Sequence, residues 1–123
     1  MIDAAAIRRL ALALPEVVEA SRGDQLAFEV TGGKGLVWSF MLRVHPKKPR
    51  IPDASAVAVR CLVERKEMLV AAAPDRFFDD DHYRGYPAVL IRLAAIDEQE
   101  FSALLKDAWR LSAPKALVGR LED

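Results

Sequence analysis

Cysteine, histidine and net charge are all scarce in this 123-residue sequence. The one cysteine, Cys61, excludes an intrachain disulfide and any multi-cysteine metal site, and such a composition is usual in a reducing compartment. Basic and acidic side chains number 18 each, so the chain lacks the strong positive charge that is common in nucleic-acid-binding domains. Any binding of DNA would therefore need a local basic patch.

Long apolar runs are also missing. No stretch approaches the roughly 20 consecutive apolar residues of a membrane span, and the acidic start of the chain does not resemble an export signal. We therefore expect a cytoplasmic protein with no membrane partner. An apolar fraction of 52% with 29% charged residues is typical of a folded chain, and we expect residues 1–123 to form a single domain.

Alternation of apolar and polar residues predicts the strands. Because only a half-buried strand satisfies a period of two, we expect five of them, at residues 26–30, 36–44, 57–61, 77–78 and 89–93. In the second strand, Leu36, Trp38 and Phe40 should share one face and Val37 the other. The glycines of segment 31–35 predict a hairpin turn, and the prolines of segment 45–52 predict a loop.

Helical spacing of apolar residues predicts the helices. Asp3 and Asp97 are placed to cap two of them, and Met68 and Leu69 should lie on the buried face of another. The expected helices cover residues 3–14, 64–73 and 97–111, with a short one after Pro114. The order α-β-β-β-α-β-β-α predicts an α+β fold, a two-layer sandwich of an antiparallel sheet with helices on one face.

The segment 77–93, FFDDDHYRGYPAVLIRL, is similar to the signature of the MmcQ/YjbR-like family of small bacterial proteins. Segments 108–110 (AWR) and 113–115 (APK) resemble the family's C-terminal pattern, and segment 27–38 resembles its first hairpin. The resemblance covers nearly the whole chain. It implies a fold shared in outline with type III secretion chaperones, and binding of DNA through a double-wing surface made from hairpins.

One departure from the family's pattern is the acidic triplet at residues 79–81, where less charge and often a proline are expected. Its negative charge makes a phosphate site directly at the His82 turn less favourable. Asp79, Asp80, Asp81 and His82 together suggest a metal site, but neighbouring side chains on an extended chain point apart and the spacing of a calcium loop is missing. We predict no metal and no cofactor.

Basic residues gather in the proline-rich loop. Arg43, Lys47, Lys48 and Arg50 have few acids near them and are suited to contact phosphates, as a wing does. Lys34, in the glycine-rich turn, would add to this set if the glycines allow close approach to a nucleic-acid backbone. The alternatives are a solvated loop and a plain hairpin turn.

The signature segment supplies the second candidate surface. Its histidine, tyrosines and arginine are suited to stacking bases or to holding an anionic ligand, with two further cations joining them: His82, Tyr83, Arg84, Tyr86, Arg92 and Lys115. The structural alternative is that Tyr86 fixes the entry to a strand. In that alternative Arg92 and Lys115 pair with acids such as Glu100 and Asp107.

No catalytic pattern is present in the sequence. Cys61 lies in an alternating apolar segment, where a cysteine is usually buried and inert, and no nucleophile elbow, phosphate loop or dinucleotide motif occurs. The leading hypothesis is a non-enzymatic protein that binds DNA through its hairpins and basic loop. The alternatives are a protein-interaction or chaperone-like module, and a pocket for a small anionic ligand against His82, Arg84 and Arg92.

Overall fold

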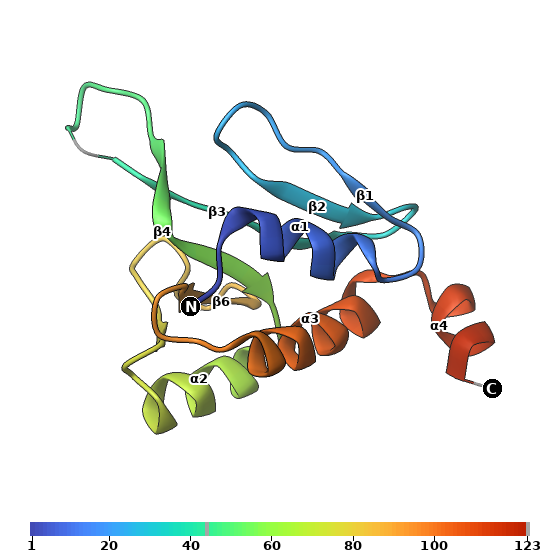
Figure 1. Cartoon of the computed structure of the whole chain (residues 1–123). Coiled ribbons are helices and arrows are strands. Elements are labelled where there is room, and N and C mark those ends of the chain that lie inside the picture. Colours follow the sequence, from blue (N-terminus) through green and yellow to red (C-terminus); the bar gives the residue numbers. More distant parts are fainter. Residues whose placement is uncertain (44, 123) are drawn as a thin grey trace.

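A six-stranded antiparallel sheet with helices on one face forms the body of the protein (Figure 1). The computed structural model describes residues 1–43 and 45–122. The elements are α1 (Ala4–Leu12), β1 (Val17–Glu19), β2 (Ala27–Val30), β3 (Gly35–Leu42), β4 (Ile51–Arg60), α2 (Val63–Ala72), β5 (Phe77–Phe78), β6 (Ala88–Arg92), α3 (Glu98–Ser112) and α4 (Lys115–Glu122). In the sheet the strands follow the order β1-β2-β3-β4-β6-β5. The predicted α+β two-layer class is confirmed.

The main core lies between the sheet and the helices. Phe101 and Leu105 of α3 pack with Val59 of β4 and Ile91 of β6, and each of these side chains is at most 1% exposed. Burying one such side chain stabilises the fold by about 1.5–3 kcal/mol. Both predicted helix starts are present: Asp3 Oδ1 accepts from the Ala6 amide at 2.8 Å and Asp97 Oδ1 from the Glu100 amide at 2.7 Å.

One strand was not predicted, and the boundaries of another differ from the prediction. The unpredicted strand, β1, pairs antiparallel with β2, and its three residues are too few to give a visible alternation. Strand β4 begins at Ile51 rather than near residue 57, because Ile51 and Pro52 pair with the end of β3 next to an irregularity in the ladder, where a proline is tolerated. It ends at Arg60, so Cys61 lies just beyond the strand and not in it.

The predicted faces of β3 are wrong at Leu36. The β2–β3 register shifts between Phe28 and Glu29, so that Leu36 and Val37 both belong to the main core. A bulge of this kind places two successive side chains on one face, which the strict period of two does not anticipate. Trp38 and Phe40 lie on the other face. Val44, predicted to end this strand, is outside the described residues.

The predicted buried face of α2 is also wrong in part. Leu69 packs against the main core, but Met68 is 70% exposed. The residue of α2 that is fully buried is a lysine, Lys66, at 2% exposure. Within the described part of the chain, no helix has the length and apolar character needed to cross a membrane.

A smaller second core lies on the sheet face turned away from the helices, which we call the helix-free face. It contains Phe40, Tyr83 and Leu90, together with the alanines Ala58 and Ala88 of neighbouring strands. Because alanine side chains are small, they leave room above the sheet for another layer. The connection between β5 and β6 occupies this room, since Tyr83 from its middle is part of the cluster.

Candidate functional site

The β5–β6 connection, residues 79–87, is a compact double turn that we call the tyrosine loop. Asp80 Oδ1 accepts from the Tyr83 amide at 2.9 Å, and the Tyr86 amide donates to the Tyr83 carbonyl at 2.9 Å. Gly85, between the tyrosines, has a φ of 77°, a conformation that glycine adopts without strain. In this conformation of the loop, Tyr83 is 9% exposed and Tyr86 is 44% exposed.

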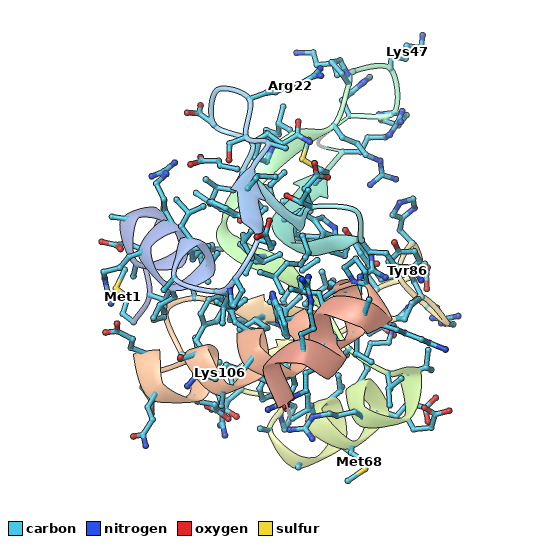
Figure 2. The ribbon with its side chains drawn as sticks, turned by 90° about the vertical axis from the view of Figure 1, so that its right-hand side faces the viewer. Met1, Arg22, Lys47, Met68, Tyr86 and Lys106 are labelled. Atoms are coloured by element: carbon cyan, nitrogen blue, oxygen red, sulfur yellow. The ribbon has the colours of Figure 1, made fainter. Side chains whose placement is uncertain are left out.

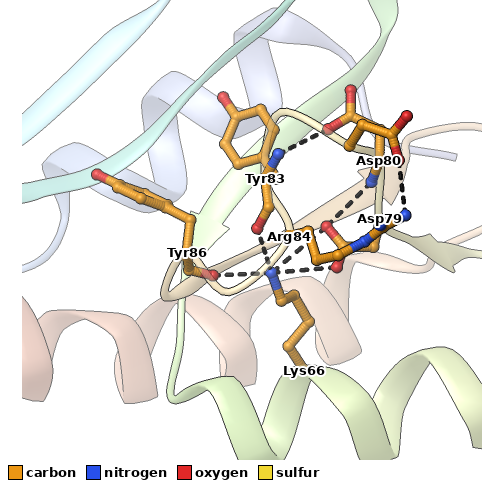
Figure 3. A network of polar contacts seen from close by, with 7 residues as sticks. Lys66, Asp79, Asp80, Tyr83, Arg84 and Tyr86 are labelled. Atoms are coloured by element: carbon orange, nitrogen blue, oxygen red, sulfur yellow. Dashed lines mark hydrogen bonds and ion pairs between the residues drawn. The ribbon is translucent and has the colours of Figure 1, made fainter.

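Lys66 of α2 holds the tyrosine loop from below (Figure 3). Its Nζ donates to the Tyr83 carbonyl at 2.7 Å and to the Tyr86 carbonyl at 2.8 Å, and it lies 3.3 Å from Asp79 Oδ2. A buried ammonium group is tolerated only when it is paired and hydrogen-bonded, and these three oxygens meet that requirement. The lysine therefore holds the backbone of both tyrosines in place.

Five aromatic rings form a continuous row across the helix-free face. The ring centroids of Phe78 and Phe40 are 5.7 Å apart, those of Phe40 and Tyr83 6.0 Å, and those of Tyr83 and Tyr86 5.8 Å. Trp38 of β3 completes the row, 6.4 Å from Tyr86. Aromatic pairs at these separations add about 0.5–1.5 kcal/mol each beyond the area they bury.

An arginine stands at each end of this aromatic row. Arg92 of β6 lies over the ring of Phe78, with its Cζ 4.2 Å from the centroid. Arg60 of β4 lies 5.4 Å from the centroid of Trp38 and donates through Nε to the Gly35 carbonyl at 2.7 Å. The face is therefore aromatic in its middle and positively charged at both ends, an arrangement used for stacking bases and holding anions.

A pocket of about 230 Å³ opens at the Trp38 end of the aromatic row, lined by Trp38, His82, Tyr83 and Tyr86. The Trp38 indole N–H donates to Tyr83 Oη at 3.0 Å. Burial raises the pKa of Tyr83, and the indole N–H and the charge of Arg50 oppose this rise only in part. Trp38, which lines this pocket, lies in β3, the strand that leads into the 43–50 loop.

A larger hollow of about 590 Å³ lies elsewhere, lined by Leu10 of α1 and by residues of α3, including Glu98 and Lys106. It contains none of the candidate site residues and no aromatic ring. Although this hollow is larger than the aromatic pocket, the chemistry of its lining gives no reason to prefer it as the binding site.

Residues 43–50, which we call the basic arm, join β3 to β4 and project beyond the sheet (Figure 1). Arg43, Lys47, Lys48 and Arg50 are all exposed, and Lys47 lies at the far end of the molecule (Figure 2). Arg43 donates to the Pro46 carbonyl at 3.0 Å and Arg50 to the Met41 carbonyl at 3.3 Å. Among the described residues, none of the four cations forms an ion pair with a carboxylate, so their charge is directed to solvent.

Lys34 does not join the basic arm. It follows the glycine-rich turn at the opposite end of β3, and its backbone amide donates to the Ser112 carbonyl of α3 at 2.8 Å. A side chain on Gly33 would place its Cβ 2.0 Å from that same carbonyl oxygen. The glycines allow a close approach of this turn to the chain's own helix α3, and their approach to a nucleic-acid backbone stays a prediction.

Of the three remaining candidate cations, Arg84 belongs to the tyrosine loop and Arg92 lies at the Phe78 end of the aromatic row, whereas Lys115 lies at the start of α4. Arg84 pairs with Asp81 at 2.6 Å. None of the three cations is among the residues that line the pocket. The acids expected to pair with Arg92 and Lys115 have other partners: Arg76 binds Glu100, and Arg65 and Arg110 bind Asp107.

The acidic triplet is divided among three partners. Asp79 pairs with Lys66, Asp80 accepts from the Tyr83 amide, and Asp81 pairs with Arg84. Over the part of the chain that is described, no three His, Cys, Asp or Glu side chains converge as metal ligands would. Cys61 is buried as predicted, and burial raises the pKa of its thiol despite the nearby charge of Lys66.

Lys66 and Arg60 are the site residues that the sequence reasoning missed. Lys66 sits at helical spacing between Val63 and Leu69, so a lysine inside an otherwise apolar stripe was a readable signal of a buried cation. Arg60 was not readable, because its position beside Trp38 depends on the pairing of Ala58 with Trp38.

Comparison with known proteins gives the family and no ligand. A model of the YjbR family matches residues 12–111. Uncharacterized proteins of Mycobacterium bovis and of two strains of Mycobacterium tuberculosis are each 37% identical over 94 residues, covering 71% of this chain and 73% of theirs. No solved structure matches significantly. The family match includes the whole aromatic row, the basic arm and the tyrosine loop, and the chain belongs to the MmcQ/YjbR family.

Proposed function

We propose that this protein binds DNA through its basic arm and does not catalyse a reaction. The observation that carries the proposal is the state of the arm: four exposed cations on a projecting hairpin, with no carboxylate between Arg43 and Pro52. Lysine and arginine side chains in this arrangement are suited to contact successive phosphates of a nucleic-acid backbone.

The distribution of charge supports a single docking orientation. The arm carries four positive charges, from Arg43, Lys47, Lys48 and Arg50, while the whole chain sums to zero. The remainder therefore has a net charge of minus four, which repels a polyanion. Attraction at the arm and repulsion elsewhere would present the arm to the DNA.

The chemistry of Cys61 argues against catalysis by a thiol nucleophile. A reactive cysteine needs a lowered thiol pKa and access to solvent. Cys61 has a raised pKa and is 5% exposed, so its thiolate form is disfavoured at neutral pH.

The test is fluorescence anisotropy of a labelled duplex titrated with the protein over a range of salt concentrations. Reversing three charges, Lys47→Glu, Lys48→Glu and Arg50→Glu, should weaken binding strongly. The slope of log affinity against log salt is negative, and each lost phosphate contact makes it less steep by about 0.9, so three contacts make it less steep by about 2.7.

The matched control reverses three exposed cations on the helices, Lys106→Glu, Lys115→Glu and Arg120→Glu. It changes the net charge by the same amount and should leave the salt slope close to that of the wild type. Equal weakening by both triple variants would show a nonspecific charge effect and contradict the arm as the interface. No binding by the wild type at low salt would contradict the function itself.

A further inference from the structure

The pocket lined by Trp38 of β3, the strand that leads into the basic arm, has the features of a ligand site that the arm does not explain. We propose that it takes an unpaired base of single-stranded DNA, whose phosphates lie along the arm; this inference rests on the proposed DNA binding. The pocket would then make the protein prefer single-stranded or locally opened DNA over intact duplex.

The walls of the pocket are aromatic rings set at nearly right angles to one another. The planes of Trp38 and Tyr86 meet at 85°, those of Tyr83 and Tyr86 at 82°, and those of His82 and Tyr83 at 84°. Rings at right angles to one another offer one ring face on which a base can stack, and the edges of the other rings then surround that base. Stacking on aromatic side chains is the usual way to hold bases without regard to sequence, because every base has a π face.

The charges around the pocket favour a neutral base attached to an anionic phosphate. Arg60 lies over Trp38, and Arg50 is near enough for its charge to lower the pKa of Tyr83 against the effect of burial. The guanidinium group of Arg60 beside the aromatic walls would repel the cationic ligands that aromatic cages often bind. It would attract the phosphates that flank a base.

The acidic side of the tyrosine loop is compatible with this orientation. The ammonium of Lys66 offsets the charge of Asp79, and Arg84 offsets that of Asp81. A phosphate would still avoid this side, so the strand would enter from the arm and place its base, rather than its backbone, against Tyr86 and His82.

The pocket is already formed before a ligand arrives. Lys66 holds the backbone carbonyls of Tyr83 and Tyr86, and the side chains of Trp38 and Tyr83 are joined by a hydrogen bond. A site that is ordered in advance loses less conformational entropy on binding. Tyr86 is the wall that remains open to solvent, at 44% exposure.

The experiment compares a short single-stranded oligothymidylate with its duplex, using anisotropy for affinity and tryptophan emission as a local reporter. The chain has two tryptophans, and Trp109 is buried with its Nε1 donating to the Pro15 carbonyl, so quenching on binding would arise from Trp38. Tyr86→Ala removes the open wall, and Tyr86→Phe keeps the ring. Both keep the backbone carbonyl that Lys66 binds.

We expect the wild type to bind the single strand more tightly than the duplex, with quenching of emission. Tyr86→Ala should weaken single-strand binding about tenfold, Tyr86→Phe should resemble the wild type, and duplex binding should be equal in all three. Unchanged single-strand affinity in Tyr86→Ala, with duplex binding still dependent on the arm, would overturn this inference alone. Failure of the wild type to bind either DNA would overturn the proposed function as well.

Discussion

At the scale of single residues, Lys66 is the side chain that connects helix α2 to the tyrosine loop. Its ammonium is buried at 2% exposure and contacts two carbonyls and one carboxylate, all from the tyrosine loop. Removing the cation would leave Asp79 without its counter-ion, and each carbonyl would keep only its backbone donor, the Tyr86 amide for Tyr83 and the Ala88 amide for Tyr86. The loop therefore depends on one side chain of α2.

Lys66→Met keeps most of the side-chain volume and removes the charge. We expect it to lower the free energy of unfolding by about 2–4 kcal/mol, because Asp79 loses its counter-ion and two carbonyls each lose a bond from a charged donor. Urea denaturation measures the loss. Lys106→Met on exposed α3 surface is the matched control and should change stability by less than about 0.5 kcal/mol. Equal stability of the two variants would contradict the assigned role.

Tyr83 gives a prediction about pH. Burial raises the pKa of its phenol above the ordinary value of 10.0, so the folded protein holds this proton more tightly than the unfolded chain does. The stability that this proton provides is complete below pH 10.0 and is lost as the pH rises towards the folded pKa. The absorbance of tyrosinate follows the titration, and the chain has only one other tyrosine, Tyr86.

Subtracting the alkaline titration of Tyr83→Phe from that of the wild type isolates the Tyr83 component. Its midpoint should lie above pH 10.0, the ordinary value. A midpoint at or below that value would mean that the phenol is not buried as the structure places it.

At the scale of elements, the hairpin between β2 and β3 is hydrogen-bonded to Ser112 at the end of α3. The amide of Lys34 donates to the carbonyl of Ser112, and the hydroxyl of Ser112 donates to the Gly35 carbonyl at 3.2 Å. Gly33 lies against the same carbonyl, and only a residue without a Cβ fits there. This contact fixes the sheet's position relative to its longest helix.

Gly33→Ala should separate the hairpin from α3. Its Cβ would lie 2.0 Å from the Ser112 oxygen, and the backbone must shift to relieve the overlap. We expect a loss of about 2 kcal/mol or more of unfolding free energy, read from denaturant midpoints. Gly119→Ala in α4, where no atom lies within 4 Å of the added Cβ, is the control and should be neutral or stabilise by up to about 1 kcal/mol. Similar effects of the two alanines would contradict the docking contact.

At the scale of the whole molecule, the sheet separates two cores of unequal size. Strands β3, β4 and β6 contribute to both, whereas β1 pairs with one neighbour only and the tyrosine loop covers the smaller core alone. Stability in such a structure is not uniform, because segments with few buried contacts open without unfolding the rest. We therefore expect the candidate pocket to belong to the less stable part.

Native-state hydrogen exchange should rank these parts. The amides of Val59 in β4 and Ile91 in β6 should exchange slowest, through global unfolding, and those of Tyr83 and Tyr86 should exchange faster, through opening of the loop. Exchange measured amide by amide at increasing denaturant distinguishes the two routes. Loop amides as protected as Val59 would mean that the molecule opens as one unit.

The sequence by itself determined the class of fold, the helices and most of the strands. Asp3 and Asp97 cap their helices, the stripe of Phe101 and Leu105 is buried, and the glycine-rich hairpin forms where it was predicted. The signature segment also identified the family. These features depend on spacing and caps within a few residues of one another, which is why they can be read along the chain.

Only the tertiary structure decided the faces of β3 and the composition of the candidate site. The bulge opposite Phe28 moved Leu36 to the main core and left Trp38 on the helix-free face. Trp38 then meets Tyr83, 45 positions away, and Lys66 meets the Tyr86 carbonyl, 20 positions away. Contacts at such separations depend on strand register and helix placement, which local patterns of hydrophobicity do not specify.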